Sequence, residues 1–311
     1  MSAMAVVAAL ACAGSAAPAA AQQNEIPADV WSGDSAMDDV ATLLKFTPRS
    51  IGAPGHQQAI DYIESQLAKT PFAAVTSQRW TFRSDDGADH AMTNLIARLN
   101  PSNPRRIIVA THYDSIVRAY ADTKDPNGLM PGANNSASGV ALLLETARAL
   151  SRLPPPPVGI DMIFFDGEEG PKSLGAGDPN WFAIGSPYFI AHLSDFYPDH
   201  KPESGVDFDM VCYRDLKLKP ELSSLVYAKT QTAKFWSIGL ATAPSVFLRT
   251  PTAYPVSDDH TALTQAGIPS LLVIDFEYDP WFNTTQDTID KCSAGSLAAV
   301  GGTLLRYLYA Q

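Results

Sequence analysis

The sequence predicts an α/β fold with a mostly parallel central sheet that has helices on both faces. Short apolar runs rich in β-branched residues, such as 106–111 and 158–165, are typical of strands buried on both faces. Segments with a helical spacing of apolar residues lie between these runs, and strands that alternate with helices usually form a parallel sheet covered on both sides. No Pro/Gly-rich linker divides residues 34–311, which we therefore interpret as one domain.

The expected elements follow one another in a regular order. A first helix, capped by Asp34 and running to Leu44, and a second helix after Gly55 precede all strands. Strands are expected at 74–82, 90–99, 106–111, 158–165, 206–212 and 269–275. Further helices are expected at 140–150, 188–195, 230–241, 260–266 and 296–309. Ligand sites of such sheets lie outside the carboxyl ends of the strands, which directs attention to the residues that follow each strand.

The first 21 residues differ in kind from the rest of the chain. They carry no charged side chain, contain a short apolar core at 6–12 and end in three alanines before two glutamines. This pattern is typical of a secretory signal peptide, since the apolar run is too short to span a membrane. Lipid attachment at Cys12 is the alternative, although the residues before it fit a lipobox poorly. We therefore expect a secreted or periplasmic protein, with residues 22–33 as an exposed linker before the domain.

Composition excludes some classes of partner. The chain has a net charge of −11 and no basic stripe, which argues against nucleic acid as a partner. No later segment reaches the roughly 18 uninterrupted apolar residues that a membrane-spanning helix needs. Cys212 and Cys292 follow the expected signal peptide, and the sequence leaves open whether they pair. The oligomeric state is left open as well.

Polar and ionisable residues gather near the ends of the predicted strands. They are, in chain order, His112 and Asp114, Glu168 and Glu169, Asp209, the triplet Asp258, Asp259 and His260, and Asn283. Taken singly, each has an ordinary structural explanation, such as a hydrogen-bonded histidine, a solvated Glu pair or a helix N-cap. Together, at successive strand ends, they favour one functional site.

The residue types at these strand ends suit zinc. Zinc binds histidine nitrogen and carboxylate oxygen, and a catalytic zinc site leaves one position for water or substrate. His112 and Asp114 are two residues apart, so on an extended segment they point the same way, and one can bind metal while the other orients it. The adjacent Glu168 and Glu169 can divide the work, one as ligand and the other as general acid/base.

Five ordered motifs resemble those of the M28 metallopeptidases. They are Thr-His-Tyr-Asp-Ser at 111–115, Gly-Ala-Asn-Asn-Ser-Ala-Ser-Gly at 132–139, Phe-Phe-Asp-Gly-Glu-Glu at 164–169, Asp-Asp-His at 258–260 and Asn-Thr-Thr-Gln-Asp-Thr at 283–288. Residues 48–52 also resemble an early Pro-Arg-x-x-Gly element of that family. The resemblance implies two zinc ions that share a residue at position 135 and a general base at Glu168. The remaining implied ligands are His112 and Asp209 for one ion, and Glu169 and position 283 for the other.

The glutaminyl cyclase branch of this superfamily is similar in further features, among them Asp-Asp-His and the long segment after the Glu pair. The similarity implies one Zn2+ held at positions 135, 169 and 283. Glu168 would move a proton, supported by Asp209 and Asp259. Such an enzyme converts the N-terminal glutamine of a peptide or protein to pyroglutamate. Trp181 and Trp281, in loops flanking the implied site, are candidates for contact with substrate.

The chain departs from both patterns at two implied ligand positions. Asn135 stands where the family has an aspartate, and Asn283 stands where it has a late histidine. Asparagine is a neutral amide with a weak acceptor oxygen, so the zinc affinity should fall severely. The late position does not depend on the alignment, because residues 281–288 contain no histidine.

Hypotheses of different classes remain open. An active zinc enzyme, with the cyclase favoured over the aminopeptidase, would tolerate the amides or recruit neighbours such as His260 or Asp114. A metal-poor relative would bind peptide N-termini without turnover. The retained acidic residues favour some surviving chemistry, because unpaired buried carboxylates are unfavourable without a cation. An unrelated α/β hydrolase is disfavoured, since the sequence has no Gly-x-Ser-x-Gly motif.

Overall fold

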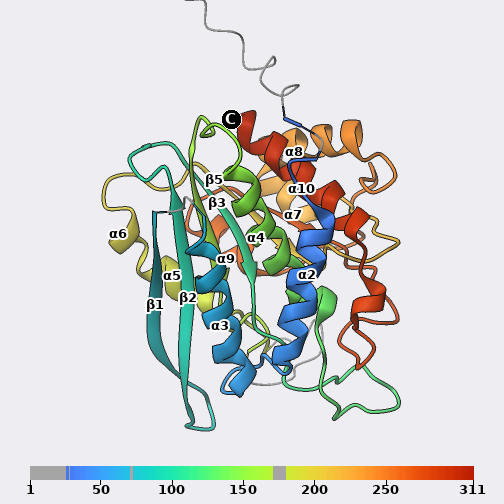
Figure 1. Cartoon of the computed structure of the whole chain (residues 1–311). Helices are drawn as coiled ribbons and strands as arrows, with labels where there is room; N and C mark the ends of the chain where they lie inside the picture. Colours follow the sequence, from blue (N-terminus) through green and yellow to red (C-terminus); the bar gives the residue numbers. More distant parts are fainter. Residues whose placement is uncertain (1–25, 28, 71–72, 171–179) are drawn as a thin grey trace, which may run out of the picture.

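The computed structural model describes residues 26–27, 29–70, 73–170 and 180–311 (Figure 1). The expected signal peptide and residues 22–25 of the expected linker lie outside these ranges. The prediction of an exposed linker is wrong for Ile26 and Trp31, which are 8% and 5% exposed. Trp31 donates its ring N–H to Thr146 (3.0 Å) and packs on Gly301, where a Cβ would come within 2.1 Å of the indole. The side chain of Trp31 thus anchors a segment whose polar composition predicts an exposed linker.

Within the described residues, six strands form one sheet in the order β1-β2-β4-β3-β5-β6. The strands are β1 (Ala73–Arg83), β2 (Asp89–Leu99), β3 (Arg106–His112), β4 (Gly159–Phe165), β5 (Ser204–Asp209) and β6 (Ser270–Ile274). β4, β3, β5 and β6 pair in parallel, whereas β1 pairs with β2, and β2 with β4, in antiparallel fashion. The predicted mostly parallel sheet is confirmed, with an antiparallel hairpin at one edge (Figure 1).

Burial explains the composition of the parallel strands. Every residue of β3, β4, β5 and β6 is buried, as expected for strands covered on both faces. In β3, Ile107 and Val109 belong to one apolar core, whereas Ile108 and Ala110 belong to the other. β5 ends earlier than predicted, because Met210 has a φ of 48° and leaves the extended conformation.

Helices cover both faces of the sheet, as predicted (Figure 1). One face carries α2 (Gly33–Leu43), α3 (Pro54–Leu67), α4 (Gly139–Leu150) and α10 (Ala294–Tyr309), with α8 (Lys229–Thr242) against α10. The other face carries α5 (Gly185–Ala191), α6 (Leu193–Phe196) and α9 (Asp259–Gln265). Shorter elements are α7 (Leu222–Tyr227) beside β6, and the helical turns η2 (Leu44–Phe46), η3 (Ala133–Ser138) and η4 (Ile289–Lys291).

Three details of the helices differ from the prediction. The cap of α2 is Ser32, whose hydroxyl accepts the backbone N–H of Ser35, and not Asp34. The helix expected at 188–195 breaks at His192 into α5 and α6. α7 has no predicted counterpart, because six residues are too few to show a helical period.

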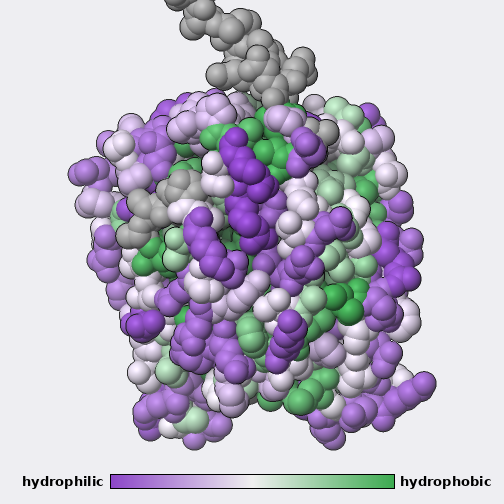
Figure 2. Space-filling view, viewed as in Figure 1, coloured by the Kyte–Doolittle hydropathy of each residue, from purple (hydrophilic) through white to green (hydrophobic). Residues whose placement is uncertain are grey.

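Hydrophilic residues spread over the face seen in Figure 1, with hydrophobic residues interspersed among them (Figure 2). None of the described helices is long and apolar enough to cross a membrane. Cys212 and Cys292 form a disulfide, with their Cα atoms 4.7 Å apart. This bond ties the segment after β5 to the segment before α10 and answers the question that the sequence left open.

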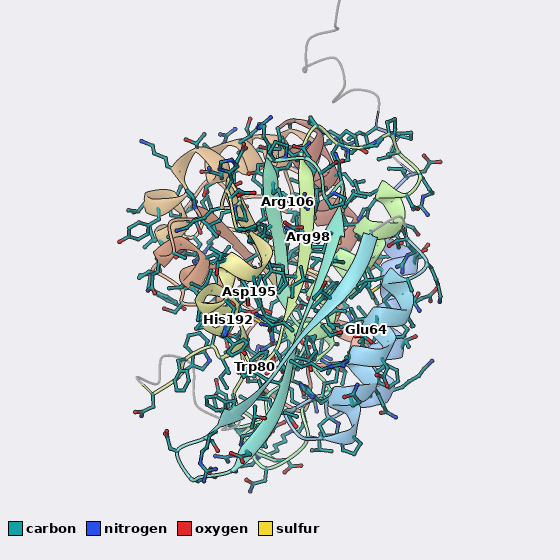
Figure 3. All side chains as sticks on the ribbon, turned by 90° about the vertical axis from the view of Figure 1, so that its left-hand side faces the viewer. Glu64, Trp80, Arg98, Arg106, His192 and Asp195 are labelled. Carbon is teal, nitrogen blue, oxygen red and sulfur yellow. A yellow bond between two sulfur atoms is a disulfide. The ribbon has the colours of Figure 1, made fainter. Side chains whose placement is uncertain are left out.

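The amino end of β3 is held by an ion cluster in which Arg98 and Arg106, both labelled in Figure 3, meet the buried Asp161. Arg106 donates to this carboxylate through Nε (2.7 Å) and Nη2 (2.5 Å), and Arg98 donates through Nε (3.0 Å). Tyr197 donates its hydroxyl to the same carboxylate at 2.6 Å. Two guanidinium groups therefore compensate the buried negative charge of Asp161.

Candidate functional site

The candidate site lies at the carboxyl ends of β3, β4 and β5. His112 is the last residue of β3, and its Nε2 lies 3.3 Å from Oδ1 of Asp209, the last residue of β5. Its Nδ1 lies 3.3 Å from Asp114 Oδ1 and 4.0 Å from Glu168 Oε2. Parallel strands bring these residues together because their carboxyl ends meet at one edge of the sheet. The predicted convergence of these four residues is confirmed.

Backbone contacts to Asp114 hold the Glu168–Glu169 pair. The Asp114 carboxylate accepts the N–H groups of Glu168 and Glu169, both at 3.1 Å. Gly167, directly before the pair, has a φ of 71°, which only glycine adopts readily. A Cβ at this glycine would also come within 2.6 Å of a methionine side chain. Asp114 thus contacts both His112 and the backbone of the Glu pair and orients them relative to each other.

A buried histidine supports the same turn. His56 Nε2 lies 2.7 Å from Asp166 Oδ1, and the other oxygen of Asp166 accepts the backbone N–H of Thr93 at 2.7 Å. The ring of His56 stacks on Tyr113, with the ring centroids 5.4 Å apart. A lone histidine on a predicted helix gives no signal of such a partner, so sequence reasoning does not find this role.

Asp287 fixes the loop that carries Asn135. Its carboxylate accepts the backbone N–H groups of Asn134 (2.9 Å) and Asn135 (3.0 Å). It also accepts the hydroxyl of Tyr278 at 2.8 Å. The late motif and the Asn135 loop are therefore one structural unit.

Arg49 holds the same loop from its other side. This side chain is fully buried and donates to the carbonyl oxygens of Pro131 (3.0 Å) and Gly132 (2.8 Å). Gly132 has a φ of 69°, and a Cβ there would come within 2.4 Å of the Asn135 carbonyl oxygen. Arg49 and Asp287 were not among the predicted site residues. Their place in the motifs at 48–52 and 283–288 is the signal that could have found them.

The side chains of Asn135 and Asn283 contact each other, and Asn135 also contacts Glu169. Asn135 Nδ2 donates to Glu169 Oε1 (2.5 Å) and to Asn283 Oδ1 (3.2 Å). Asn283 Nδ2 donates to the hydroxyl of Tyr120 at 3.1 Å. Asn135 Oδ1 is buried with no hydrogen-bond partner among the described residues. The structure therefore brings Asn135 to Glu169 and Asn283 to Asn135, and Asn135 presents a donor to Glu169.

The triplet from Asp258 to His260 begins α9. Asp258 accepts the backbone N–H of Asp259 at 2.7 Å, and Asp259 accepts the hydroxyl of Ser186. His260 Nε2 lies 3.7 Å from Glu221 Oε2, and neither ring nitrogen has a hydrogen-bond partner in the described part of the chain. The ring thus lies beside Glu221, which does not support the expectation that His260 replaces a lost metal ligand.

The two candidate tryptophans have different surroundings. Trp181 donates its ring N–H to the Glu168 carbonyl at 3.1 Å, which places it beside the Glu pair. Trp281 packs on the apolar cluster that includes Tyr278, and the Lys291 ammonium lies 4.5 Å from its ring centroid. Trp181 is therefore the better placed of the two for contact with a ligand.

Burial and crowding shift the ionisation of the site. Burial raises the pKa of Glu168 well above its ordinary value, against the opposing charge of His112, and the charge of Asp258 raises it further. Burial also raises the pKa of Glu169 to about 7. Burial alone would lower the pKa of His112, but hydrogen bonds to two carboxylates raise it well above its ordinary value. The site concentrates carboxyl groups whose ionised forms a cation would stabilise.

The donor set does not fit a zinc ion. In the part of the chain that the structure describes, no group of three or more His, Cys, Asp or Glu side chains could hold a metal. Of the three positions implied for one zinc, only Glu169 is ionisable, and Asn135 turns an N–H group toward it. The ring nitrogens of His112 each face a carboxylate at 3.3 Å. The expected ligands at 135 and 283 thus act as hydrogen-bonding groups.

Known proteins are similar to this chain in sequence and fold. The chain is 28% identical to aminopeptidase YwaD of Bacillus subtilis over 256 residues, which are 78% of this chain and 50% of that protein. The solved structure of Tannerella forsythia glutaminyl cyclase is similar, with a TM-score of 0.82 and 27% identity over 90% of this chain and 99% of that one. A Zn-dependent exopeptidase from Parabacteroides distasonis gives a TM-score of 0.83 and 26% identity over the same shares of the two chains. The model of peptidase family M28 matches residues 94–308, so the chain belongs to this family.

Proposed function

We propose that this chain binds the free amino end of peptides at the residues His112, Asp114, Glu168, Glu169 and Asp209, which we call the acidic site. The observation that carries the proposal is the concentration of buried carboxyl groups around His112. A peptide ammonium supplies a positive charge and three N–H donors, which complement carboxylate acceptors. Charge-assisted hydrogen bonds of this kind are stronger than those between neutral groups.

Glu168 and Asp209 are the groups that a ligand can reach. Their side chains keep 12% and 10% exposure, whereas the side chain of Asp114 is fully buried. Both carboxylates lie within 4.0 Å of the His112 ring, so they flank one small region. Trp181 lies beside Glu168 and offers an apolar surface to the first residue of the peptide.

The relatives support a peptide N-terminus as the ligand. They are named as an aminopeptidase and as a glutaminyl cyclase, two activities that concern the first residue of a peptide. Peptides that begin with glutamine are therefore the first ligands to test.

Cyclisation of N-terminal glutamine is a second candidate function. It is favoured by Glu168, since a buried carboxylate with a raised pKa is a stronger base than an ordinary one and can pass a proton from the α-amine to the leaving amide. Asp209 and Asp259 would support that transfer. Binding is proposed first, because the donor set does not fit the zinc ion on which such relatives are expected to depend. The aminopeptidase reaction meets the same objection.

We also propose that the chain is exported to the periplasm or the medium. The support is the uncharged apolar segment at 1–21 and the Cys212–Cys292 disulfide, which is typical of oxidising compartments. The mass of the protein recovered from those fractions tests the proposal. Cleavage after Ala21 is expected, and an intact amino terminus in the cytoplasm would contradict it.

Calorimetric titration of the full chain with a glutaminyl tripeptide, free or acetylated at its amino group, tests the main proposal. Only the free peptide should bind, and Glu168→Gln should weaken its binding about tenfold or more, because a charged hydrogen-bond partner is lost. Glu203→Gln, at an exposed carboxylate paired with Arg105, is the matched control and should leave binding unchanged. Equal binding of the acetylated peptide would refute the proposal, and release of ammonia from the free peptide would establish the second candidate.

A further inference from the structure

We infer that hydrogen bonds between side-chain amides have replaced the metal in this chain. The replacement consists of Glu169, Asn135, Asn283 and Tyr120, which we call the amide bridge. The inference concerns the metal alone, so it stands whether or not the acidic site binds peptide N-termini.

The hydrogen bonds of the amide bridge diverge from Asn135, which donates to Glu169 on one side and to Asn283 on the other. The NH2 group of Asn135 has two hydrogens, and it meets two acceptors, Glu169 Oε1 at 2.5 Å and Asn283 Oδ1 at 3.2 Å. The NH2 group of Asn283 then donates to Tyr120. Turning the Asn135 amide over would set its oxygen against the oxygens of Glu169 and Asn283. The neighbours therefore determine the orientation of this amide.

The two asparagines, which stand where the family has an aspartate at 135 and a histidine at 283, complement each other. Asn135 donates to Asn283 Oδ1. This hydrogen bond satisfies one donor of Asn135 and the acceptor oxygen of Asn283 without a metal. Glu169 is 7% exposed, and a carboxylate at that depth needs a donor or a cation. The Asn135 N–H is that donor. An asparagine at 135 also carries one negative charge fewer than the aspartate of the family, which lowers the repulsion that the loss of a dication would leave.

The framework around the amide bridge does not depend on a metal. Backbone N–H bonds to Asp287 and the buried Arg49 fix the loop of Asn135. Asn283 has a φ of 52°, and its carbonyl accepts the N–H of Ala121 at 3.2 Å. Histidine, like asparagine, is among the residues that tolerate this left-handed conformation. Restoring Asp at 135 and His at 283 should therefore place two ligands beside Glu169 without rebuilding the loops.

Zinc measurements on the full chain test the inference. The variants are the wild type, Asn135→Asp, Asn283→His and the double variant Asn135→Asp/Asn283→His. Bound zinc is measured by elemental analysis after dialysis against a weak chelator, and affinity by titration with zinc chloride against a fluorescent chelator. The melting temperature with and without zinc gives a third readout that does not rely on activity.

The wild type should hold no stoichiometric zinc and should not be stabilised by it. The double variant should hold about one equivalent, with an affinity at least about 100-fold above that of the wild type, since ligand losses weaken zinc more than the 10–100-fold typical of supporting residues. Glu169→Ala in the double variant should abolish the gain. Without zinc the double variant should melt below the wild type, because a carboxylate at 135 would face Glu169 in place of the amide donor.

Two results would overturn the inference. One is an equivalent of zinc in the wild type that Glu169→Ala removes. The other is a folded double variant, judged by circular dichroism, that gains no zinc affinity. If the double variant fails to fold, the wild-type measurement still decides. The variant Gln58→His/Asn127→Asp adds the same side chains at exposed positions and should gain no zinc.

Discussion

At the amino end of β3 the buried carboxylate of Asp161 meets the guanidinium groups of Arg98 and Arg106, whereas at the carboxyl end carboxyl groups crowd around His112. Both ends are buried in the same sheet, so burial does not distinguish them. The difference is compensation of charge. The amino end pairs its charge with two guanidinium groups, whereas the carboxyl end gathers several carboxyl groups around one histidine.

The two ends of β3 therefore contribute differently to the stability of the fold. A paired buried charge is costly to break, because one partner is then left without compensation. A crowded carboxyl group with a raised pKa destabilises the native state at neutral pH, and neutralising it should stabilise the fold. Substitutions at the two ends should thus change the free energy of unfolding in opposite directions.

The largest effect is expected at the amino end. Arg106→Met keeps the bulk of the side chain but removes its two hydrogen bonds to Asp161. We expect a loss of about 3–5 kcal/mol in the free energy of unfolding, measured by urea denaturation. A loss below about 1 kcal/mol would show that Arg98 and Tyr197 alone compensate this carboxylate.

The next effect depends on pH and involves His260. Burial lowers the pKa of His260 to about 4 from an ordinary value of 6.5, so the unfolded chain binds a proton between these values that the folded chain does not. Stability is therefore lost as pH falls from 6.5 toward 4. Compared with His260→Leu, the wild type should lose about 2 kcal/mol more between pH 7 and pH 5 in urea denaturation. Parallel curves for the two proteins would contradict this account of His260.

A smaller effect of opposite sign is expected within the acidic site. The pKa of Glu168 is raised well above its ordinary value, so its ionised form destabilises the folded state above the unfolded pKa. Glu168→Gln should raise the free energy of unfolding by about 0.5–2 kcal/mol at pH 8 and by less at pH 5. The same substitution should weaken peptide binding, which would show a conflict between function and stability. If Glu168→Gln instead lowered the free energy of unfolding at pH 8, a positive group within the fold would have to compensate the ionised Glu168.

The smallest effect is expected for an exposed ion pair. Arg105 contacts Glu203 at 2.8 Å, and both side chains are about half exposed. Arg105→Met should change the free energy of unfolding by at most about 1 kcal/mol, because solvent screens such pairs. This variant is also the control for Arg106→Met, since the two arginines are adjacent in sequence, and Arg106 differs by its burial and the backbone carbonyls that it contacts with its buried guanidinium. A similar loss in both variants would remove burial as the reason for the difference.

Much of the fold follows from the sequence, because the apolar periodicity and the alternation of strands and helices along the chain are local signals. The parallel strands and the convergence of His112, Asp114, Glu168 and Asp209 were predictable in this way. The burial of Trp31 was not, because it depends on Thr146 and Gly301, which are remote in sequence.

The chemistry at the metal positions was only partly predictable. The sequence shows that residues 135 and 283 are amides, but an amide can present an oxygen or an N–H group. Which one faces Glu169 depends on the other acceptor, Asn283 Oδ1, and hence on the fold. The direction of His260 toward Glu221 is likewise a property of packing.

The acidic site is proposed to work through its own charges, without a metal. Calorimetric titration of the wild-type chain with a free glutaminyl tripeptide, once in EDTA and once in zinc chloride, tests this most directly. We expect the chain to bind the tripeptide with the same affinity in EDTA and in zinc chloride. Binding that appears only after zinc is added would contradict it.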